Sequence, residues 1–184
     1  MQVNAPTTVA ASGGRYASKG LYETPDTVEA LFEYASSPVN DAGFVARFVN
    51  HFGHGPDGHS YGIQFYGTDG TLFLNREGYT IWPPNLATDV WETFGSTEVV
   101  HGDATPQHQP HVLNFLDCVK SRQKPNSDME TTHRSVSACL LANIALRTGR
   151  KLHWDAQREQ CLGDAEADKL LNEERRKPWE SALG

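Results

Sequence analysis

The sequence predicts an α+β fold, with an open, mainly antiparallel sheet and helices packed on one face. Short runs of β-forming residues separated by glycine-rich turns fill residues 1–83, and helical patterns dominate from residue 111 onward. Strands joined by short loops must be antiparallel, because parallel pairs need a long crossover. Since the strands precede the helices and do not alternate with them, the pattern is typical of the α+β class.

Six runs are expected to form strands. The clearest is 28–34, where Val28 and Phe32 point to one side while Glu29 and Glu33 point to the other. Gly67-Thr68-Asp69-Gly70 is a hairpin signal. The expected strands are 7–12, 28–34, 44–49, 61–66, 71–74 and 79–82.

Residues 83–110 are rich in Pro, Thr, Asn and Gly, which predicts a long surface loop with one short strand around 98–100. A length of 184 residues fits a single domain. We therefore predict one domain over residues 1–184, with the loop at 83–110 and a C-terminal arm at 155–184.

Two longer helices are predicted after this loop. The first carries an apolar stripe and is expected to end at Lys124-Pro125. The second is expected to begin with a capping box in which Ser127 is the N-cap and Glu130 reaches back, and to end at Gly149. A strand over 151–154 and a short helix from Asp164 to Leu171 should follow. The first stripe is Val112, Phe115, Leu116 and Val119; the face of the second helix expected to be buried carries Val136, Cys139, Leu140, Asn143 and Ile144.

Composition excludes several classes of protein. The net charge is −7, and because nucleic-acid binding needs clustered Lys and Arg, we predict no nucleic-acid partner. No apolar run approaches the ~18 residues that span a bilayer, so no membrane partner is predicted. No signal peptide is visible, which makes the cytoplasm the default expectation, although an export signal would be lost with a missing N-terminal half. The cysteines lack a C-x-x-C pair and predict no disulfide framework; Cys118 and Cys139 are expected to be buried.

The run from Gly53 to Gly58, Gly-His-Gly-Pro-Asp-Gly, has the spacing of a dinucleotide-binding fingerprint, but we reject that interpretation. The fingerprint works only where a strand feeds a helix whose N-terminal amides hold a pyrophosphate. Here the following residues predict a strand, and Asp57 would place a negative charge beside the phosphates. A glycine-rich connection between strands is the prediction.

Histidines gather on two loop regions and raise the possibility of zinc binding. Their spacings lack the rigid i, i+4 placement of a helical pair, and polar histidines on the surface are the alternative that we prefer. No metal site is predicted. The histidines are His51, His54, His59, His101, His108 and His111.

Two groups of residues are candidates for contacting a ligand. His133, next to Arg134 at the start of the second helix, should either bond a neighbouring strand carbonyl or line a substrate cavity. Tyr79 and Trp82, with Trp91 and Phe94, could stack on a sugar ring, or belong to the core or a subunit contact.

Several segments together resemble the C-terminal domain of the Gfo/Idh/MocA oxidoreductase family, most closely its branch in planctomycetes and related bacteria. They cover nearly the whole chain in the family's order. The segments are Ala11-Ser12-Gly13-Gly14-Arg15-Tyr16, Glu23-Thr24-Pro25-Asp26-Thr27, Phe65-Tyr66-Gly67-Thr68-Asp69-Gly70-Thr71-Leu72, Asn114-Phe115-Leu116-Asp117-Cys118-Val119-Lys120-Ser121-Arg122, His133-Arg134-Ser135, Gly149-Arg150-Lys151-Leu152-His153-Trp154-Asp155 and Gly163-Asp164-Ala165-Glu166-Ala167.

The resemblance implies a two-domain enzyme. An N-terminal Rossmann domain binds NAD or NADP, and hydride passes between the nicotinamide and a sugar or polyol. A Lys from a Glu-Lys-Pro motif and an Asp-x-x-x-His pair handle the proton. The C-terminal domain shapes the substrate site, and one face of its sheet packs against another subunit, which implies a homo-oligomer. Within this chain the candidate substrate contacts are His133, Arg134, Arg15, Tyr79 and Trp82.

The chain departs from the family in what it lacks. It contains no Glu-Lys-Pro, no Asp-x-x-x-His and no Rossmann domain. We therefore expect it to bind no cofactor, to hold no catalytic residue and to be inactive alone. The main hypothesis is the substrate-binding and oligomerisation domain of an NAD(P)-dependent sugar or polyol oxidoreductase. Two alternatives stay open: a free-standing binding or assembly module, and a sugar-active hydrolase or lyase relative.

Overall fold

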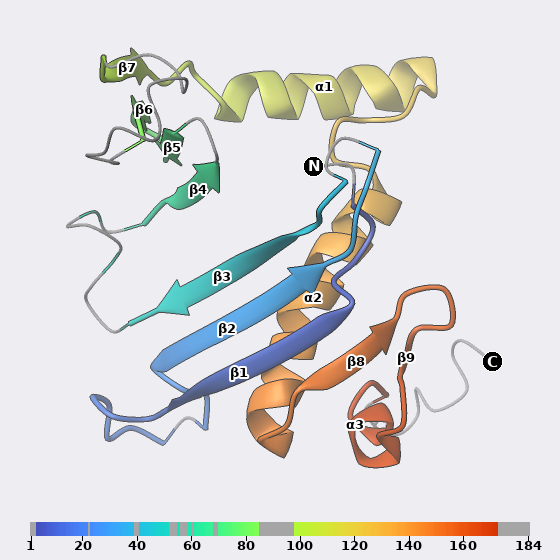
Figure 1. Cartoon of the computed structure of the whole chain (residues 1–184). Helices are drawn as coiled ribbons and strands as arrows, with labels where there is room; N and C mark the ends of the chain where they lie inside the picture. Colours follow the sequence, from blue (N-terminus) through green and yellow to red (C-terminus); the bar gives the residue numbers. More distant parts are fainter. Residues whose placement is uncertain are drawn as a thin grey trace. The chain divides into compact units, whose positions relative to one another are not determined.

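A computed structural model describes residues 3–21, 23–38, 41–51, 55, 59, 61–67, 70–84 and 98–172. Within these ranges the chain forms strands followed by helices, with two further short strands between the last helices (Figure 1). The elements are β1 (Thr8–Gly14), β2 (Thr27–Tyr34), β3 (Phe44–Asn50), β4 (Ile63–Gly67), β5 (Gly70–Leu74), β6 (Gly78–Trp82), β7 (Val100–Asp103), α1 (His108–Ser121), α2 (Met129–Thr148), β8 (Leu152–Asp155), β9 (Gln160–Cys161) and α3 (Ala165–Lys169).

The chain divides into two compact units. The first comprises Met1–Phe52 together with Ser127–Gly184, and the second comprises Gly53–Asn126. The first unit holds a five-stranded sheet in the order β3-β2-β1-β8-β9, and the second holds a four-stranded sheet in the order β4-β5-β6-β7. Every pairing among the described strands is antiparallel. The predicted α+β class with open antiparallel sheets is confirmed.

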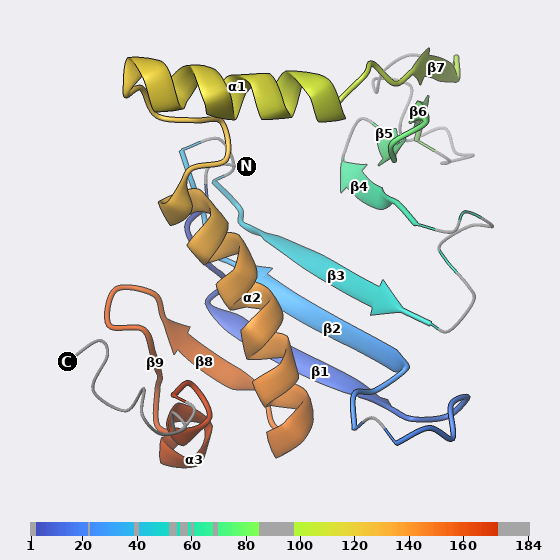
Figure 2. The same cartoon turned by 180° about the vertical axis from the view of Figure 1, so that it is seen from behind.

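Helix α2 covers one face of the five-stranded sheet (Figure 2). The alternation in β2 that predicted a strand also decides which side chains lie under the helix. Val28, Ala30 and Phe32 are buried, whereas Leu31 and Glu33 are exposed on the other face. Val9, Leu141 and Leu152 have the largest side chains that are fully buried, and each contributes roughly 1.5–3 kcal/mol by burial.

The N-terminus of α2 differs from the prediction by one residue, whereas its C-terminus agrees. The N-cap is Asp128, not Ser127, because the Asp128 carboxylate accepts bonds from the amides of Glu130 (3.1 Å) and Thr131 (3.2 Å). The helix does end at Gly149, as predicted, in the left-handed conformation that glycine adopts without strain (φ 65°).

Of the face of α2 that was predicted to be buried, Ile144 is buried, whereas the other members are exposed. Val136 and Leu140 are 48% and 54% exposed. The helix instead packs on β1 through small residues, which allow close approach of helix and sheet, together with the larger Leu141. The buried residues of α2 are Leu141, Ala142, Ile144 and Ala145. Cys139 is exposed and Cys118 half-buried, so burial of these thiols is not found; the buried cysteine is Cys161, where burial raises the thiol pKa to about 11.

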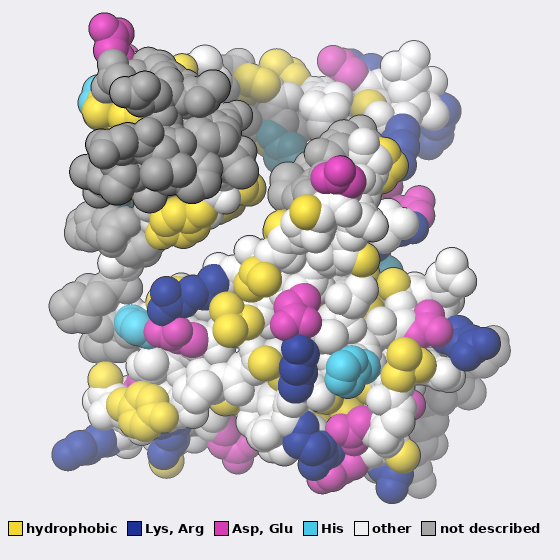
Figure 3. Space-filling view, viewed as in Figure 1, with side chains coloured by type: hydrophobic (Ala, Val, Ile, Leu, Met, Phe, Trp, Pro, Cys, Tyr) yellow, Lys and Arg dark blue, Asp and Glu magenta, His cyan; other side chains and the backbone are white. Residues whose placement is uncertain are grey.

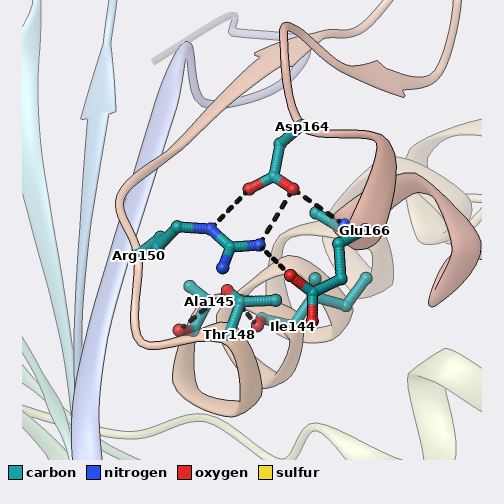
Figure 4. A network of polar contacts seen from close by, with 7 residues as sticks. Ile144, Ala145, Thr148, Arg150, Asp164 and Glu166 are labelled. Atoms are coloured by element: carbon teal, nitrogen blue, oxygen red, sulfur yellow. Dashed lines mark hydrogen bonds and ion pairs between the residues drawn. The ribbon is translucent and has the colours of Figure 1, made fainter.

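An ionic cluster fastens α3 to the end of α2 (Figure 4). Arg150 donates to both carboxylate oxygens of Asp164, at 2.8 and 2.9 Å, and to Glu166 at 2.9 Å. Asp164 is also the N-cap of α3, accepting from the Ala167 amide, so one carboxylate closes the helix and holds the arginine. The cluster raises the Arg150 pKa and lowers that of Asp164, chiefly through their mutual hydrogen bonds.

In the second unit, α1 ends earlier than predicted, at Ser121. Its C-cap is Arg122, which takes the left-handed conformation (φ 61°) and bonds the Cys118 carbonyl. The Gly67–Gly70 hairpin is confirmed by the pairing of β4 with β5. Most of the glycine-rich run 53–58 lies outside the described residues, but the element that follows it is a strand, β4, as expected. No helix among the described residues is long and apolar enough to cross a bilayer.

Candidate functional site

The loop between β1 and β2 is built around one carboxylate. Asp26 accepts three consecutive backbone amides, those of Tyr16 (3.0 Å), Ala17 (3.0 Å) and Ser18 (2.7 Å). These bonds stabilise the charged form and hold the Asp26 pKa well below its usual value, with Tyr16 the largest contributor. The Asp26 carboxylate therefore fixes the path of the loop that carries Arg15.

Arg15 follows Gly14 at the end of β1, and its side chain is on the surface. Its Nη1 donates to the Gly20 carbonyl at 3.2 Å. Position 13, two residues before Arg15, requires glycine. A Cβ atom there would overlap the Thr27 carbonyl oxygen of the paired strand. Arg15, one of the candidate substrate contacts, thus lies on a loop whose geometry depends on Gly13 and Asp26.

His133 and Arg134 occupy the first turns of α2, and each has a carboxylate as its partner. The His133 ring is exposed, and its Nε2 lies 2.7 Å from the Glu159 carboxylate. Arg134 donates to Glu130 one turn earlier on the same helix. The partner of His133 is therefore a side chain in the β8–β9 turn, where Glu159 has a positive φ of 52°, and not a strand carbonyl.

Tyr79 and Trp82 both lie on β6, but on opposite faces of the four-stranded sheet, because their positions differ by three, an odd number. The Tyr79 face is wholly apolar apart from the tyrosine hydroxyl: its paired residues are Ile63, Phe65, Leu72, Leu74, Tyr79, Ile81 and Val100, together with Gly67, Gly70 and Gly102. The structure does not bring the two rings together. The other aromatic candidates, Trp91 and Phe94, lie outside the described residues.

We call the opposite side of this sheet the Trp82 face. Its paired residues are Gln64, Tyr66, Thr71, Phe73, Thr80, Trp82, His101 and Asp103, together with Gly78. Tyr66, Thr71 and Trp82 form one row across three strands. In the next row Thr80 and His101 are joined by a 3.0 Å hydrogen bond between Oγ1 and Nδ1, and Phe73 is buried beneath the stacked ring of His59.

The face of the five-stranded sheet away from α2 is lined by paired charges (Figure 3). Glu29 bonds Arg47 at 2.7 Å and His51 at 3.1 Å. Glu33 bonds Lys151 at 2.8 Å and accepts from the Thr8 hydroxyl at 2.6 Å. Arg47 and Lys151 are the principal causes that lower the pKa of Glu29 and Glu33, respectively. Both carboxylates therefore remain ionised and neutralised by their partners.

Among the described residues, no three His, Cys, Asp or Glu side chains converge as metal ligands. The glycine-rich run leads into β4, so the chain's one fingerprint-like segment does not open a helix able to hold a pyrophosphate. The segment therefore lacks the strand-to-helix context in which the dinucleotide fingerprint works.

A family model described as "Oxidoreductase family, C-terminal alpha/beta domain", for the Gfo/Idh/MocA group, matches residues 89–181. The match includes α1, α2 and the elements that follow them. A comparison with curated proteins finds no match.

Solved structures with a similar fold are oxidoreductases. An aldose-aldose oxidoreductase from Caulobacter crescentus, complexed with glycerol, has a TM-score of 0.58 at 13% identity over 82% of this chain and 42% of its own. The UDP-N-acetylglucosamine 3-dehydrogenase of Acidithiobacillus ferrooxidans has a TM-score of 0.55 at 14% identity over 79% and 43%. An Agrobacterium radiobacter oxidoreductase, in complex with NAD+, L-tartaric acid and magnesium, has 0.54 at 16% over 82% and 44%. The chain thus spans less than half the length of these proteins.

Proposed function

The chain belongs to the Gfo/Idh/MocA oxidoreductase family, as a counterpart of its C-terminal alpha/beta domain, and we propose that it is the substrate-side and oligomerisation part of an NAD(P)-dependent sugar or polyol oxidoreductase. The match to the C-terminal family model is the observation that carries this proposal. The antiparallel pairing of all described strands supports it, because nucleotide-binding domains are built on parallel sheets. The resemblance supplies the sugar or polyol as the substrate class.

The chain by itself performs no hydride transfer in this proposal. Its sequence contains neither Glu-Lys-Pro nor Asp-x-x-x-His, so it has none of the motifs that would place a proton donor beside a nicotinamide. Its contribution is to contact the substrate. The proposed contacts are His133, Arg134, Arg15, Tyr79 and Trp82.

Arg15 is the member of this set best suited to orient a polar substrate. A guanidinium offers several donors in a planar fork, and it can hold a hydroxyl or carboxylate in one orientation. The Asp26 bonds fix the loop that carries it. A loop held in one conformation loses little entropy when the ligand binds.

The purified chain is expected to bind no NADH and to oxidise no aldose or polyol with NAD+ or NADP+. When it is joined in one polypeptide to a Rossmann domain encoded immediately upstream of the Met1 codon, dehydrogenase activity should appear. Nicotinamide absorbance measures turnover, and fluorescence titration measures NADH binding.

Turnover by the 184 residues alone would refute the proposal. DNA upstream that encodes no nucleotide-binding domain would instead favour a free-standing module. The joined polypeptide carrying Arg15→Ala is the informative variant, because the loss of a substrate contact should raise KM while NADH affinity stays unchanged.

The oligomerisation role is proposed for the face of the five-stranded sheet that α2 leaves open. Leu31 and Val45 are exposed there, between charged groups that are already paired. An apolar centre with a polar surround is the usual anatomy of a subunit interface. Because Glu29 and Glu33 have partners within the same sheet, their burial against a second copy leaves no lone charge.

Val45→Asp is expected to convert the assembled chain to monomers, since it places a carboxylate directly opposite Glu33 within the interface. Sedimentation velocity gives the mass. Val136→Asp is the matched control, because Val136 is exposed on α2, away from this face. A wild-type chain that sediments as a monomer would contradict the proposal, as would equal dissociation by both variants.

A further inference from the structure

The structure assigns a saccharide-binding surface to the Trp82 face: we propose that it stacks neutral pyranose rings on Tyr66 and Trp82. The site lies wholly within the four-stranded sheet of the second unit. It rests on the proposed function only in taking a carbohydrate as the class of ligand.

The first argument is the placement of the two aromatic rings. Tyr66 on β4 and Trp82 on β6 both pair with Thr71 on β5, so the three side chains stand in one row on the same face. Tyr66 is 79% exposed and Trp82 is 36% exposed. Strands in a sheet lie about 4.8 Å apart, which separates the two positions by roughly 10 Å. Two rings at this spacing can stack on two sugars of one oligosaccharide that have a single sugar unit between them.

The second argument is the set of hydrogen-bonding groups beside the rings. The hydroxyl of Thr71 lies between them, and Thr80 and His101 follow in the next row. A sugar presents an apolar C–H face and a rim of hydroxyls, so it needs a flat ring below and short polar groups at the side. The Tyr79 face offers apolar side chains with a single hydroxyl, so it has fewer groups than the Trp82 face for bonding the hydroxyls of a saccharide.

The third argument concerns charge and selects the kind of sugar. The paired residues of the Trp82 face include no Lys or Arg, and they include one carboxylate, Asp103. A phosphate or a nucleotide-linked sugar needs cations or clustered backbone amides to replace its water. The face therefore favours neutral saccharides over sugar phosphates.

The test titrates the full 184-residue chain with cellotetraose by calorimetry, with glucose 6-phosphate and the acyclic polyol sorbitol in parallel. Cellotetraose should bind, and the other two should bind at least about tenfold more weakly. Trp82→Ala and Tyr66→Ala should each weaken cellotetraose binding about tenfold, the size of one lost stacking contact. Phe65→Leu, at an exposed ring on the opposite face of β4 from Tyr66, should bind like the wild type.

Both alanine variants replace exposed rings, and circular dichroism would verify that each one folds. The inference is overturned if cellotetraose does not bind, if sorbitol binds equally well, or if Phe65→Leu reduces binding as much as Trp82→Ala. It is also overturned if Trp82→Ala changes only the mass of the assembled chain, since the face would then be a contact between copies. None of these measurements involves a nicotinamide, so this inference and the proposed function can fail separately.

Discussion

Replacing Leu141 with alanine should lower the free energy of unfolding of the first unit by about 3 kcal/mol. Leu141 is 1% exposed and lies in the cluster formed by α2 and the five-stranded sheet, with Val9 and Leu152. Removing its branched end leaves a cavity among residues held by the β1–β8 pairing, where the backbone cannot easily close in. Urea denaturation followed by far-ultraviolet circular dichroism measures the loss.

The adjacent residue supplies a matched control. Leu140→Ala makes the same chemical change on the same helix, but Leu140 is 54% exposed, so its cost should stay below about 1 kcal/mol. Equal losses for the two variants would mean that α2 is turned differently on the sheet. The comparison also decides between the predicted stripe through Leu140 and the observed stripe through Leu141.

The strands could be predicted because their signals are local. Alternation in residues 28–34 and the Gly67–Gly70 hairpin depend on neighbours in sequence, and both features are present in the structure. The face of α2 could not be predicted in the same way. Stripes through Leu140 and through Leu141 both have helical spacing, and the buried stripe contains the smaller residues Ala142 and Ala145. Which stripe becomes buried depends on the shape of the sheet that the helix packs against. The sequence of the helix contains no information on that shape.

The features of the candidate site also divide into those with a local sequence signal and those that depend on contacts distant in sequence. Side chains alternate between the two faces along β6, which already places Tyr79 and Trp82 on opposite faces. The prediction that grouped these two rings did not use this signal. The pairing of Tyr66 with Thr71 follows from the hairpin and could also have been found. The bonds from Asp26 to three amides could not, because they join residues eight to ten apart through an irregular loop. The same holds for the contact of His133 with Glu159.

Gly13→Ala should destabilise the first unit by about 2–3 kcal/mol, since the added methyl group must displace backbone and not a movable side chain. Gly13 pairs with Val28, and its Cβ would overlap the Thr27 carbonyl oxygen and approach the Val28 Cα at 2.9 Å. The end of the β1–β2 ladder would open, and with it the loop that Asp26 organises. Thermal and urea unfolding measure the stability, and amide exchange at Tyr16 to Ser18 reports on the loop.

Gly14→Ala tests whether this effect comes from the backbone clash. A Cβ at Gly14 would meet only the Tyr16 ring, at 3.1 Å, and that ring is mostly exposed and free to move aside. Its cost should therefore stay within about 0.5 kcal/mol. Similar losses in the two variants would show that the loop is sensitive to any added side chain and that the Thr27 carbonyl is not the cause. A large loss confined to Gly13→Ala, with faster exchange at the Asp26-bonded amides, would tie the packing of the two strands to the position of Arg15.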